Sequence, residues 1–207
     1  IELKKFSEKL GIHFFATPFD FKSVDFLEEI GVEAFKIASA DLINIPLQTY
    51  IAKKNKQIFL STGGGTIEDI DRACKNILKI NKKLSILHCT ASYPVDISEM
   101  NLKVISVLRK KYPKLIIGIS DHESGIDASS IAYMMGARVF EKHVTLNRGW
   151  KGTDHSFALE HHGFRNFVRD IRRVPEMMSP KDEGELGREP VFIKLGKSIV
   201  ANIDLKI

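Results

Sequence analysis

The sequence predicts an α/β protein built as a (β/α)8 barrel (a TIM barrel), and two features carry this prediction. First, short apolar runs of strand length alternate with longer amphipathic stretches of helix length, the pattern of repeated βαβ units around a parallel sheet. Second, the predicted strand ends are evenly spaced, at intervals of 22, 22, 28, 31 and 23 residues, and each is polar or reactive. They are Thr17, Ser39, Ser61, Cys89, Ser120 and His143. An open, doubly wound sheet is the alternative architecture.

Six runs are predicted as buried parallel strands because they are short and mostly β-branched or aromatic. They cover residues 13–16, 34–38, 57–60, 84–88, 115–119 and 138–141. A closed barrel has eight strands. Because the sequence begins at Ile1 without a methionine, we expect the first two strands to precede this chain in a longer protein.

Amphipathic stretches between these runs predict the helices. In residues 67–80 the apolar side chains share one face. Gly31 gives the preceding helix a C-terminal stop. The helices are predicted at 24–30, 67–80, 101–111, 126–136 and from His161 to near Arg173.

The predicted domain organisation has three parts. Residues 1–173 form the barrel domain, with strands three to eight. Residues 174–193 are rich in Pro and charge, which indicates a linker or mobile loop. Residues 194–207 are expected to begin a connection to another small domain.

Composition excludes several classes of protein. The chain has 207 residues, 43% of them hydrophobic and 28% charged, which excludes a disordered or collagen-like protein. It has no run of 18 apolar residues, so no membrane span is expected, and its two cysteines fit a cytoplasmic location. The net charge is +5, but the basic clusters lie where helices end, so we expect no nucleic-acid partner.

Two histidines at neighbouring strand ends indicate a metal site. His122 follows the fifth predicted strand and His143 follows the sixth. Neutral imidazole is the commonest side-chain metal ligand, and adjacent parallel strands bring the two rings together. Asp121 and Glu141 stand near them in the sequence, and we expect these carboxylates to orient the imidazoles.

A lysine inside a strand, surrounded by hydroxyl-bearing strand ends, indicates an anion site. Burying the charge of Lys36 is unfavourable unless it meets a partner. Its two possible roles are a clamp for a phosphate or carboxylate and a Schiff-base nucleophile. The nearby hydroxyls favour the clamp. A loop after the last strand offers Asp154, whose carboxylate can accept hydrogen bonds from a polyol.

These motifs together resemble the sialic acid synthase family, the phosphoenolpyruvate-condensing nonulosonate synthases. The resemblance extends over about residues 11 to 173, and some segments look like the animal-type members that act on a phosphorylated sugar. The matching segments are 15–20, 35–41, 60–63, 88–94, 120–126, 136–143 and 154–155.

The resemblance implies a TIM barrel followed by a small antifreeze-like domain, usually in a homodimer. It implies Mn²⁺ or Mg²⁺ on His122 and His143, and condensation of phosphoenolpyruvate with an open-chain N-acetylmannosamine-type sugar. The implied catalytic residues are Lys36, Tyr93 and Asp154. The implied sugar-binding residues are Asp41, Tyr93 and Asp154. The implied phosphoenolpyruvate-binding residues are Thr17, Lys36, Ser39, Ser61 and Ser120.

Some positions depart from the family pattern, and several functions remain open. Glu123 stands where the family usually has Thr, and Ala91-Ser92 where it usually has Ser-Ala. The change at Glu123 places a carboxylate near the histidines. The sugar can be N-acetylmannosamine, its 6-phosphate, or a diacetamido sugar of legionaminic or pseudaminic acid synthesis. A non-catalytic sugar-binding barrel and a Schiff-base aldolase are the other candidates.

Overall fold

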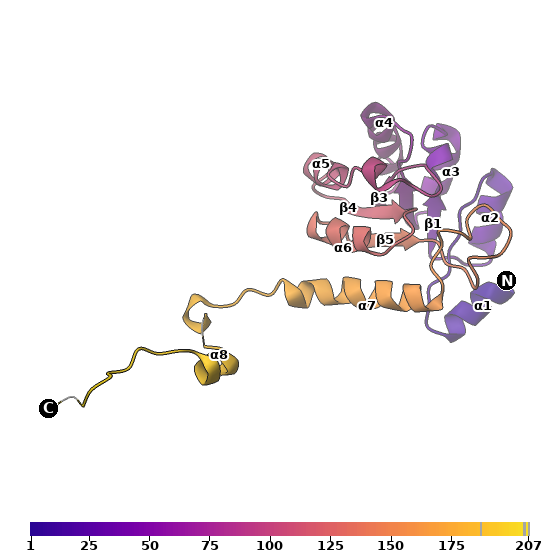
Figure 1. Cartoon of the computed structure of the whole chain (residues 1–207). Helices are drawn as coiled ribbons and strands as arrows, with labels where there is room; N and C mark the ends of the chain where they lie inside the picture. Colours follow the sequence, from indigo (N-terminus) through magenta and orange to yellow (C-terminus); the bar gives the residue numbers. More distant parts are fainter. Residues whose placement is uncertain (187, 205, 207) are drawn as a thin grey trace. The chain divides into compact units, whose positions relative to one another are not determined.

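The computed structural model describes residues 1–186, 188–204 and 206 and divides the chain into two compact units. The first unit is Ile1–Arg172 and the second is Arg173–Ile207. The first contains a parallel sheet with helices packed against it (Figure 1). The strands are β1 (Ala34–Ile37), β2 (Gln57–Ser61), β3 (Leu84–Cys89), β4 (Ile116–Asp121) and β5 (Val139–Lys142).

The strand order is β1-β2-β3-β4-β5, and every neighbouring pair is parallel. This sequential order confirms the barrel-type prediction and excludes a doubly wound sheet, in which the order reverses at a switch point. The sheet is also curled. In a flat sheet β1 and β5 would lie about 19 Å apart, yet Lys36 Nζ of β1 is 3.3 Å from Glu141 Oε2 of β5.

Helices precede, connect and follow the strands, and those between two strands complete βαβ units. They are α1 (Glu2–Lys9), α2 (Phe21–Glu29), α3 (Ile45–Lys53), α4 (Ile67–Leu78), α5 (Val104–Lys111), α6 (Asp127–Met134) and α7 (His161–Met177). Short 3-10 turns lie at η1 (Ser39–Asp41) and η2 (Ile97–Glu99). The sequence analysis missed α1 and α3, although Asn44 caps α3 and Pro46 stands in its first turn, two ordinary start signals.

The predicted strand at 13–16 is wrong. Only Ala16 pairs with the sheet, through one parallel bridge to Phe35, in which Lys36 N–H donates to the Ala16 carbonyl. Pro18 stands two residues later and has no N–H, so the pairing cannot extend through it. Helix α7, the last of the predicted helices, continues through Pro175 to Met177 rather than ending near Arg173.

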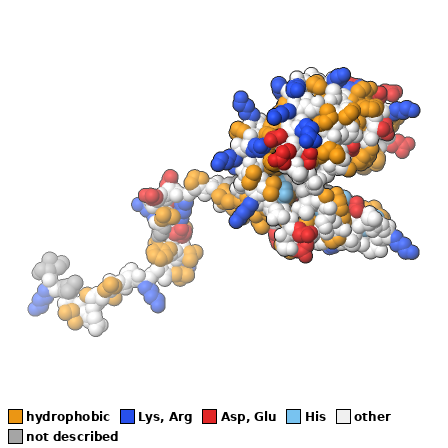
Figure 2. Space-filling model, turned by 90° about the horizontal axis from the view of Figure 1, so that it is seen from above, with side chains coloured by type: hydrophobic (Ala, Val, Ile, Leu, Met, Phe, Trp, Pro, Cys, Tyr) orange, Lys and Arg blue, Asp and Glu red, His pale blue; other side chains and the backbone are white. Residues whose placement is uncertain are grey.

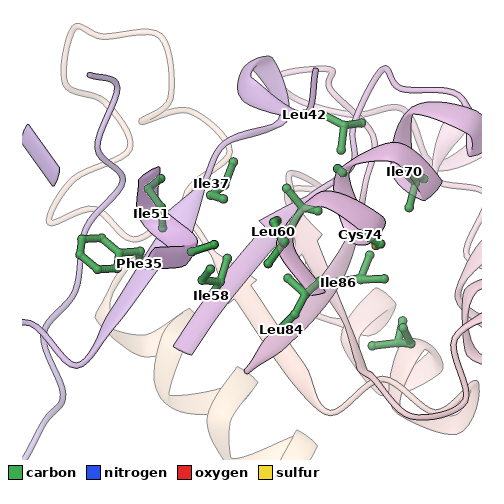
Figure 3. Packing of buried hydrophobic residues seen from close by; sticks show 14 of the residues in the cluster. Phe35, Ile37, Leu42, Ile51, Ile58, Leu60, Ile70, Cys74, Leu84 and Ile86 are labelled. Carbon is green, nitrogen blue, oxygen red and sulfur yellow. The ribbon is translucent and has the colours of Figure 1, made fainter. Parts of the chain in front are cut away.

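The hydrophobic core lies between the sheet and the helices. Phe35 and Ile37 of β1, Ile58 and Leu60 of β2, and Leu84 and Ile86 of β3 project toward α3 and α4 (Figure 3). There they meet Ile51, Ile70 and Cys74, which are also buried. Because side chains alternate along a strand, the residues between these core positions face the inner, concave side of the sheet.

The second unit contains the end of α7, the 3-10 turn η3 (Glu183–Glu185) and α8 (Pro190–Leu195). Every described residue from Pro175 onward is exposed. Whether residues 174–193 act as a linker and residues 194–207 begin a further domain stays a prediction. No helix in the described ranges is long and apolar enough to cross a membrane.

Candidate active site

A cavity of about 610 Å³ opens at the carboxyl ends of the strands, within the first unit. Residues from all five strands contribute to it, because side chains alternate along a strand and these point to the concave face. All of the residues proposed from the sequence line this cavity except Asp41. The lining consists of Thr17, Lys36, Ala38, Ser39, Ser61, Cys89, Tyr93, Ser120, His122, Glu141, His143, Thr153 and Asp154.

Lys36 carries a buried positive charge on one wall of the cavity. The residue is 9% exposed, and its ammonium group lies 3.3 Å from Glu141 Oε2. The other oxygen of Glu141 accepts a hydrogen bond of 3.2 Å from the Ser120 hydroxyl. Glu141 thus supplies the charged partner that a buried lysine needs. A Schiff-base nucleophile must instead be a neutral amine, so this arrangement favours an anion clamp.

Hydroxyl groups surround Lys36. Ser39 Oγ accepts a hydrogen bond of 2.9 Å from Gly63 N–H. Ser61 Oγ is buried and has no hydrogen-bond partner within the described residues. An unpartnered buried hydroxyl is unfavourable by about 1–3 kcal/mol. Because Ser61 lines the cavity, its hydroxyl is available to a bound ligand.

Gly63 allows the turn after β2 to approach Ser39. A Cβ atom at this position would lie 2.9 Å from both Ser39 Oγ and Cys89 Sγ. Such contacts are closer than real Cβ atoms make. The glycine is therefore required for the hydrogen bond to Ser39 and for the shape of this wall.

The two histidines lie together on the opposite wall. The ring centroids of His122 and His143 are 5.2 Å apart. His122 Nδ1 is 3.1 Å from the carbonyl oxygen of Thr90, and His143 Nδ1 is 3.6 Å from Asp154 Oδ2. The Thr90 carbonyl can only accept, so Nδ1 of His122 donates to it and Nε2 of His122 keeps its lone pair. The distance of 3.6 Å from His143 to Asp154 is too long for a hydrogen bond. Burial lowers the pKa of His122, and the neighbouring His143 lowers it further, so its ring is neutral near pH 7.

The donor set fits a divalent metal that is held by few protein ligands. Within the described ranges, no group of three or more His, Cys, Asp or Glu residues is arranged to hold a metal ion. His122 and His143 offer two imidazole nitrogens, and the Thr90 carbonyl orients the His122 ring through Nδ1, as in many metal sites. Oxygen atoms of substrate and water would complete such a shell.

The expectation that Asp121 and Glu141 orient the histidines by contacting the imidazole rings is wrong. The contacts to Nδ1 come from Thr90 and Asp154 instead. Asp121 forms an ion pair with Lys142, and Glu141 pairs with Lys36. The physical reason is strand alternation: Asp121 is adjacent to His122 in sequence, so its side chain emerges on the other face of the sheet.

Tyr93 covers the histidine pair from the loop after β3. Its ring centroid is 4.1 Å from that of His122 and 6.2 Å from that of His143. The loop is tied to β4 by a hydrogen bond of 3.2 Å from Val95 N–H to the His122 carbonyl. Burial raises the pKa of Tyr93, so its phenol stays protonated and can donate a hydrogen bond.

Asp41 is the one proposed residue that does not line the cavity. It lies in η1, where its carboxylate accepts a hydrogen bond of 2.9 Å from the Asn44 side chain. Its role toward a sugar stays a prediction. Conversely, the sequence analysis did not assign Glu141, Cys89, Ala38 or Thr153 to the ligand cavity. For Glu141 and Cys89 the alternation of side chains along a strand was an available signal. Glu141, for example, is two residues before His143, so both side chains lie on the same face of the sheet.

Comparisons with known proteins agree with this geometry. The model of the NeuB family matches residues 1–183. The chain is 36% identical to human N-acetylneuraminate-9-phosphate synthase over 99% of its own length and 57% of the relative's. It is 39% identical to N,N'-diacetyllegionaminic acid synthase of Campylobacter jejuni, over 99% of its length and 62% of the relative's. The chain thus spans about three fifths of these relatives.

A solved structure of a related protein has a similar fold. The chain superposes on the N-acetylneuraminic acid (sialic acid) synthetase of Leptospira borgpetersenii with a TM-score of 0.84 and 34% identity. The match covers 95% of this chain and 70% of that one. The family match over residues 1–183 establishes that this chain belongs to the NeuB family.

Proposed function

We propose that this protein condenses phosphoenolpyruvate with an open-chain N-acetylmannosamine-type sugar, giving a nonulosonic acid and phosphate. The observation that carries the proposal is a single cavity with two different walls. One wall presents the Lys36 cation and the unpartnered Ser61 hydroxyl, and the other presents the His122 and His143 imidazoles. The relatives named above are synthases of this kind of product.

The anion wall suits phosphoenolpyruvate. Its phosphate and carboxylate would bind at Lys36 and at the hydroxyls of Thr17, Ser39, Ser61 and Ser120. Charged acceptors form stronger hydrogen bonds than neutral ones. This binding would hold C3 of phosphoenolpyruvate against the sugar aldehyde and so contribute mainly through orientation and electrostatics.

The opposite wall suits the sugar. Tyr93 and Asp154 would bind its hydroxyl groups, because one donates and the other accepts hydrogen bonds. A divalent cation, Mn²⁺ or Mg²⁺, held by His122 and His143 would polarise the aldehyde oxygen.

The reaction balances with one water molecule. The C2=C3 electron pair of phosphoenolpyruvate forms a bond from C3 to the aldehyde carbon, and the aldehyde π pair moves to its oxygen. Water adds its hydroxyl at C2, and its remaining proton goes to the aldehyde oxygen. The C2–O bond to phosphate then breaks, and inorganic phosphate leaves. Glu141 would orient the water, since its carboxylate already lies between Lys36 and Ser120.

We propose that the protein is a homodimer, because the family that it resembles is typically dimeric.

The sugar substrate is to be identified by experiment. Relatives are named for N-acetylneuraminate-9-phosphate, diacetyllegionaminic acid and pseudaminic acid. These products require sugars that differ in phosphorylation and in the number of acetamido groups.

Phosphate release from the full-length protein tests the proposal. The assay combines phosphoenolpyruvate and Mn²⁺ with N-acetylmannosamine, its 6-phosphate or a diacetamido sugar, with and without EDTA. We expect release that needs a sugar and stops with EDTA, and the preferred sugar will identify the product. A folded protein that binds Mn²⁺ but releases no phosphate with any of these sugars would favour a non-catalytic sugar-binding barrel.

A further inference from the structure

A fully buried ion pair lies directly behind the two histidines. Asp121 Oδ2 is 2.8 Å from Lys142 Nζ, and the two side chains are 0% and 1% exposed. Asp121 is the last residue of β4 and Lys142 the last of β5, and the two are directly paired in the sheet register. His122 and His143 are the next residues along the chain. The ion pair therefore joins the two strand ends that carry the imidazoles.

The same pair also holds the backbone that follows His122. Asp121 Oδ1 accepts a hydrogen bond of 2.8 Å from Glu123 N–H. Lys142 Nζ donates to the Glu123 carbonyl as well as to Asp121. His122 is thus fixed from both sides, by Asp121 before it and by Glu123 after it. We call Asp121, Lys142 and the Glu123 peptide group the β4–β5 clamp.

Stability alone does not account for this pair. A buried ion pair loses the hydration of both charges, and well-packed apolar residues in its place are often neutral or stabilising. Its distinctive contribution is a fixed geometry, because the two charged groups and the Glu123 peptide satisfy one another. Metal sites need their ligands held to within about 0.5 Å.

We propose that the β4–β5 clamp positions His122 and His143 for joint binding of a divalent metal, so that Asp121 and Lys142 are positioning residues of the site. The inference rests on the proposed function for the use of that metal. It concerns two residues that lie outside the cavity lining.

A double variant that removes both charges of the β4–β5 clamp tests the proposal. In the variant Asp121→Asn/Lys142→Met, position 121 keeps an acceptor for Glu123 N–H and no unpaired charge remains buried. We expect Mn²⁺ to bind about 10- to 100-fold more weakly, the usual effect of losing an outer partner of a metal site. The measurement is calorimetric titration of the metal-free, full-length protein with Mn²⁺, alongside thermal unfolding.

The matched control applies the same substitutions to an ion pair remote from the cavity. Lys54, the C-cap residue of α3, has its Nζ 2.8 Å from Asp25 Oδ1 of α2. The variant Asp25→Asn/Lys54→Met should keep the Mn²⁺ affinity of the unchanged protein. If both double variants lose affinity equally, the effect is general and the inference is overturned.

Three further outcomes are decisive. Unchanged Mn²⁺ affinity in Asp121→Asn/Lys142→Met overturns the inference, and so does an unchanged protein that binds no Mn²⁺. If the double variant does not fold, Lys142→Gln keeps a donor toward Asp121, and we expect a loss of about tenfold. Unchanged affinity there also overturns the clamp. An unchanged protein that binds Mn²⁺ but releases no phosphate overturns the proposed function alone.

Discussion

Two serine hydroxyls are buried without a hydrogen-bond partner in the described residues, and only one of them lines the cavity. Ser61 Oγ faces the cavity and Ser129 Oγ lies in α6, outside its lining. Both are buried without a hydrogen-bond partner in the described part of the chain. If the cavity binds an anion, only the first hydroxyl has a ligand to meet.

We therefore expect Ser61→Ala to raise KM for phosphoenolpyruvate by about tenfold or more, because a hydrogen bond to a charged group contributes about 1.5–3 kcal/mol. Thermal stability should not fall, since no protein partner loses a hydrogen bond. Ser129→Ala is the control and should change neither KM nor stability. Steady-state kinetics and thermal unfolding check both variants, and an unchanged KM in Ser61→Ala would remove this residue from the anion site.

His88 makes the stability of the protein depend on pH. It is buried on the outer face of β3, where Nε2 lies 2.7 Å from the Met100 carbonyl. Burial lowers the pKa of His88, as it does for His122. In the unfolded chain both side chains titrate near 6.5.

The free energy of unfolding should fall as the pH drops below about 6.5. In that window the unfolded chain binds protons that the folded protein excludes, so stability rises with pH by up to about 1.4 kcal/mol per unit for each such group. Above pH 6.5 this contribution is complete. Urea unfolding between pH 5 and 8 measures the slope. His88→Gln should flatten it, and an equally steep slope in that variant would assign the effect to other groups.

At the scale of the strand, alternation decides which residues meet. In β4, Ile117, Ile119 and Asp121 face the helices, while Ser120 and then His122 face the cavity. The inner face is also closely packed at Gly118. A Cβ atom there would lie 2.4 Å from the Val139 carbonyl oxygen and 2.6 Å from Leu87 Cδ2.

Gly118→Ala should consequently destabilise the protein by about 1–3 kcal/mol, the usual effect of overpacking. The nearest obstacle is backbone of β5, which cannot rotate away. Gly184→Ala is the control, because a Cβ atom there meets nothing within 4 Å. Denaturant unfolding compares the two, and a stability loss below about 0.5 kcal/mol in Gly118→Ala would contradict the packing argument.

At the scale of the whole molecule, curvature of the sheet creates the site. The two outermost strands β1 and β5 meet through Lys36 and Glu141 across the concave face. Charged side chains are distributed over the surface of the first unit, with Lys and Arg interspersed among Asp and Glu on the face shown in Figure 2. The second unit differs, since all of its described residues beyond Val174 are exposed.

Limited proteolysis should reflect this difference. Exposed segments that make few contacts are cut first, so trypsin should cleave after Arg188, Lys194 or Lys197 before it cleaves within residues 34–142. The product should be a stable fragment that keeps the parallel sheet. Mass spectrometry of a time course identifies the sites, and early cleavage between β1 and β5 would contradict the description of two units.

The sequence by itself determined the order of strands and the residues at their carboxyl ends. Five of the six predicted strands are present in a parallel sheet, and nearly every proposed site residue lines one cavity. Both successes rest on local signals: the period of two along a strand, and the rule that parallel strands end at one edge.

Only the tertiary structure decided which charged side chains form ion pairs. Lys36 and Glu141 are 105 residues apart in sequence and come together because the sheet curls. Asp121 pairs with Lys142 rather than with its neighbour His122, because the register of β4 and β5 places those two opposite each other. Such pairs depend on curvature and register, which arise from the packing of the whole sheet and leave no local pattern in the chain.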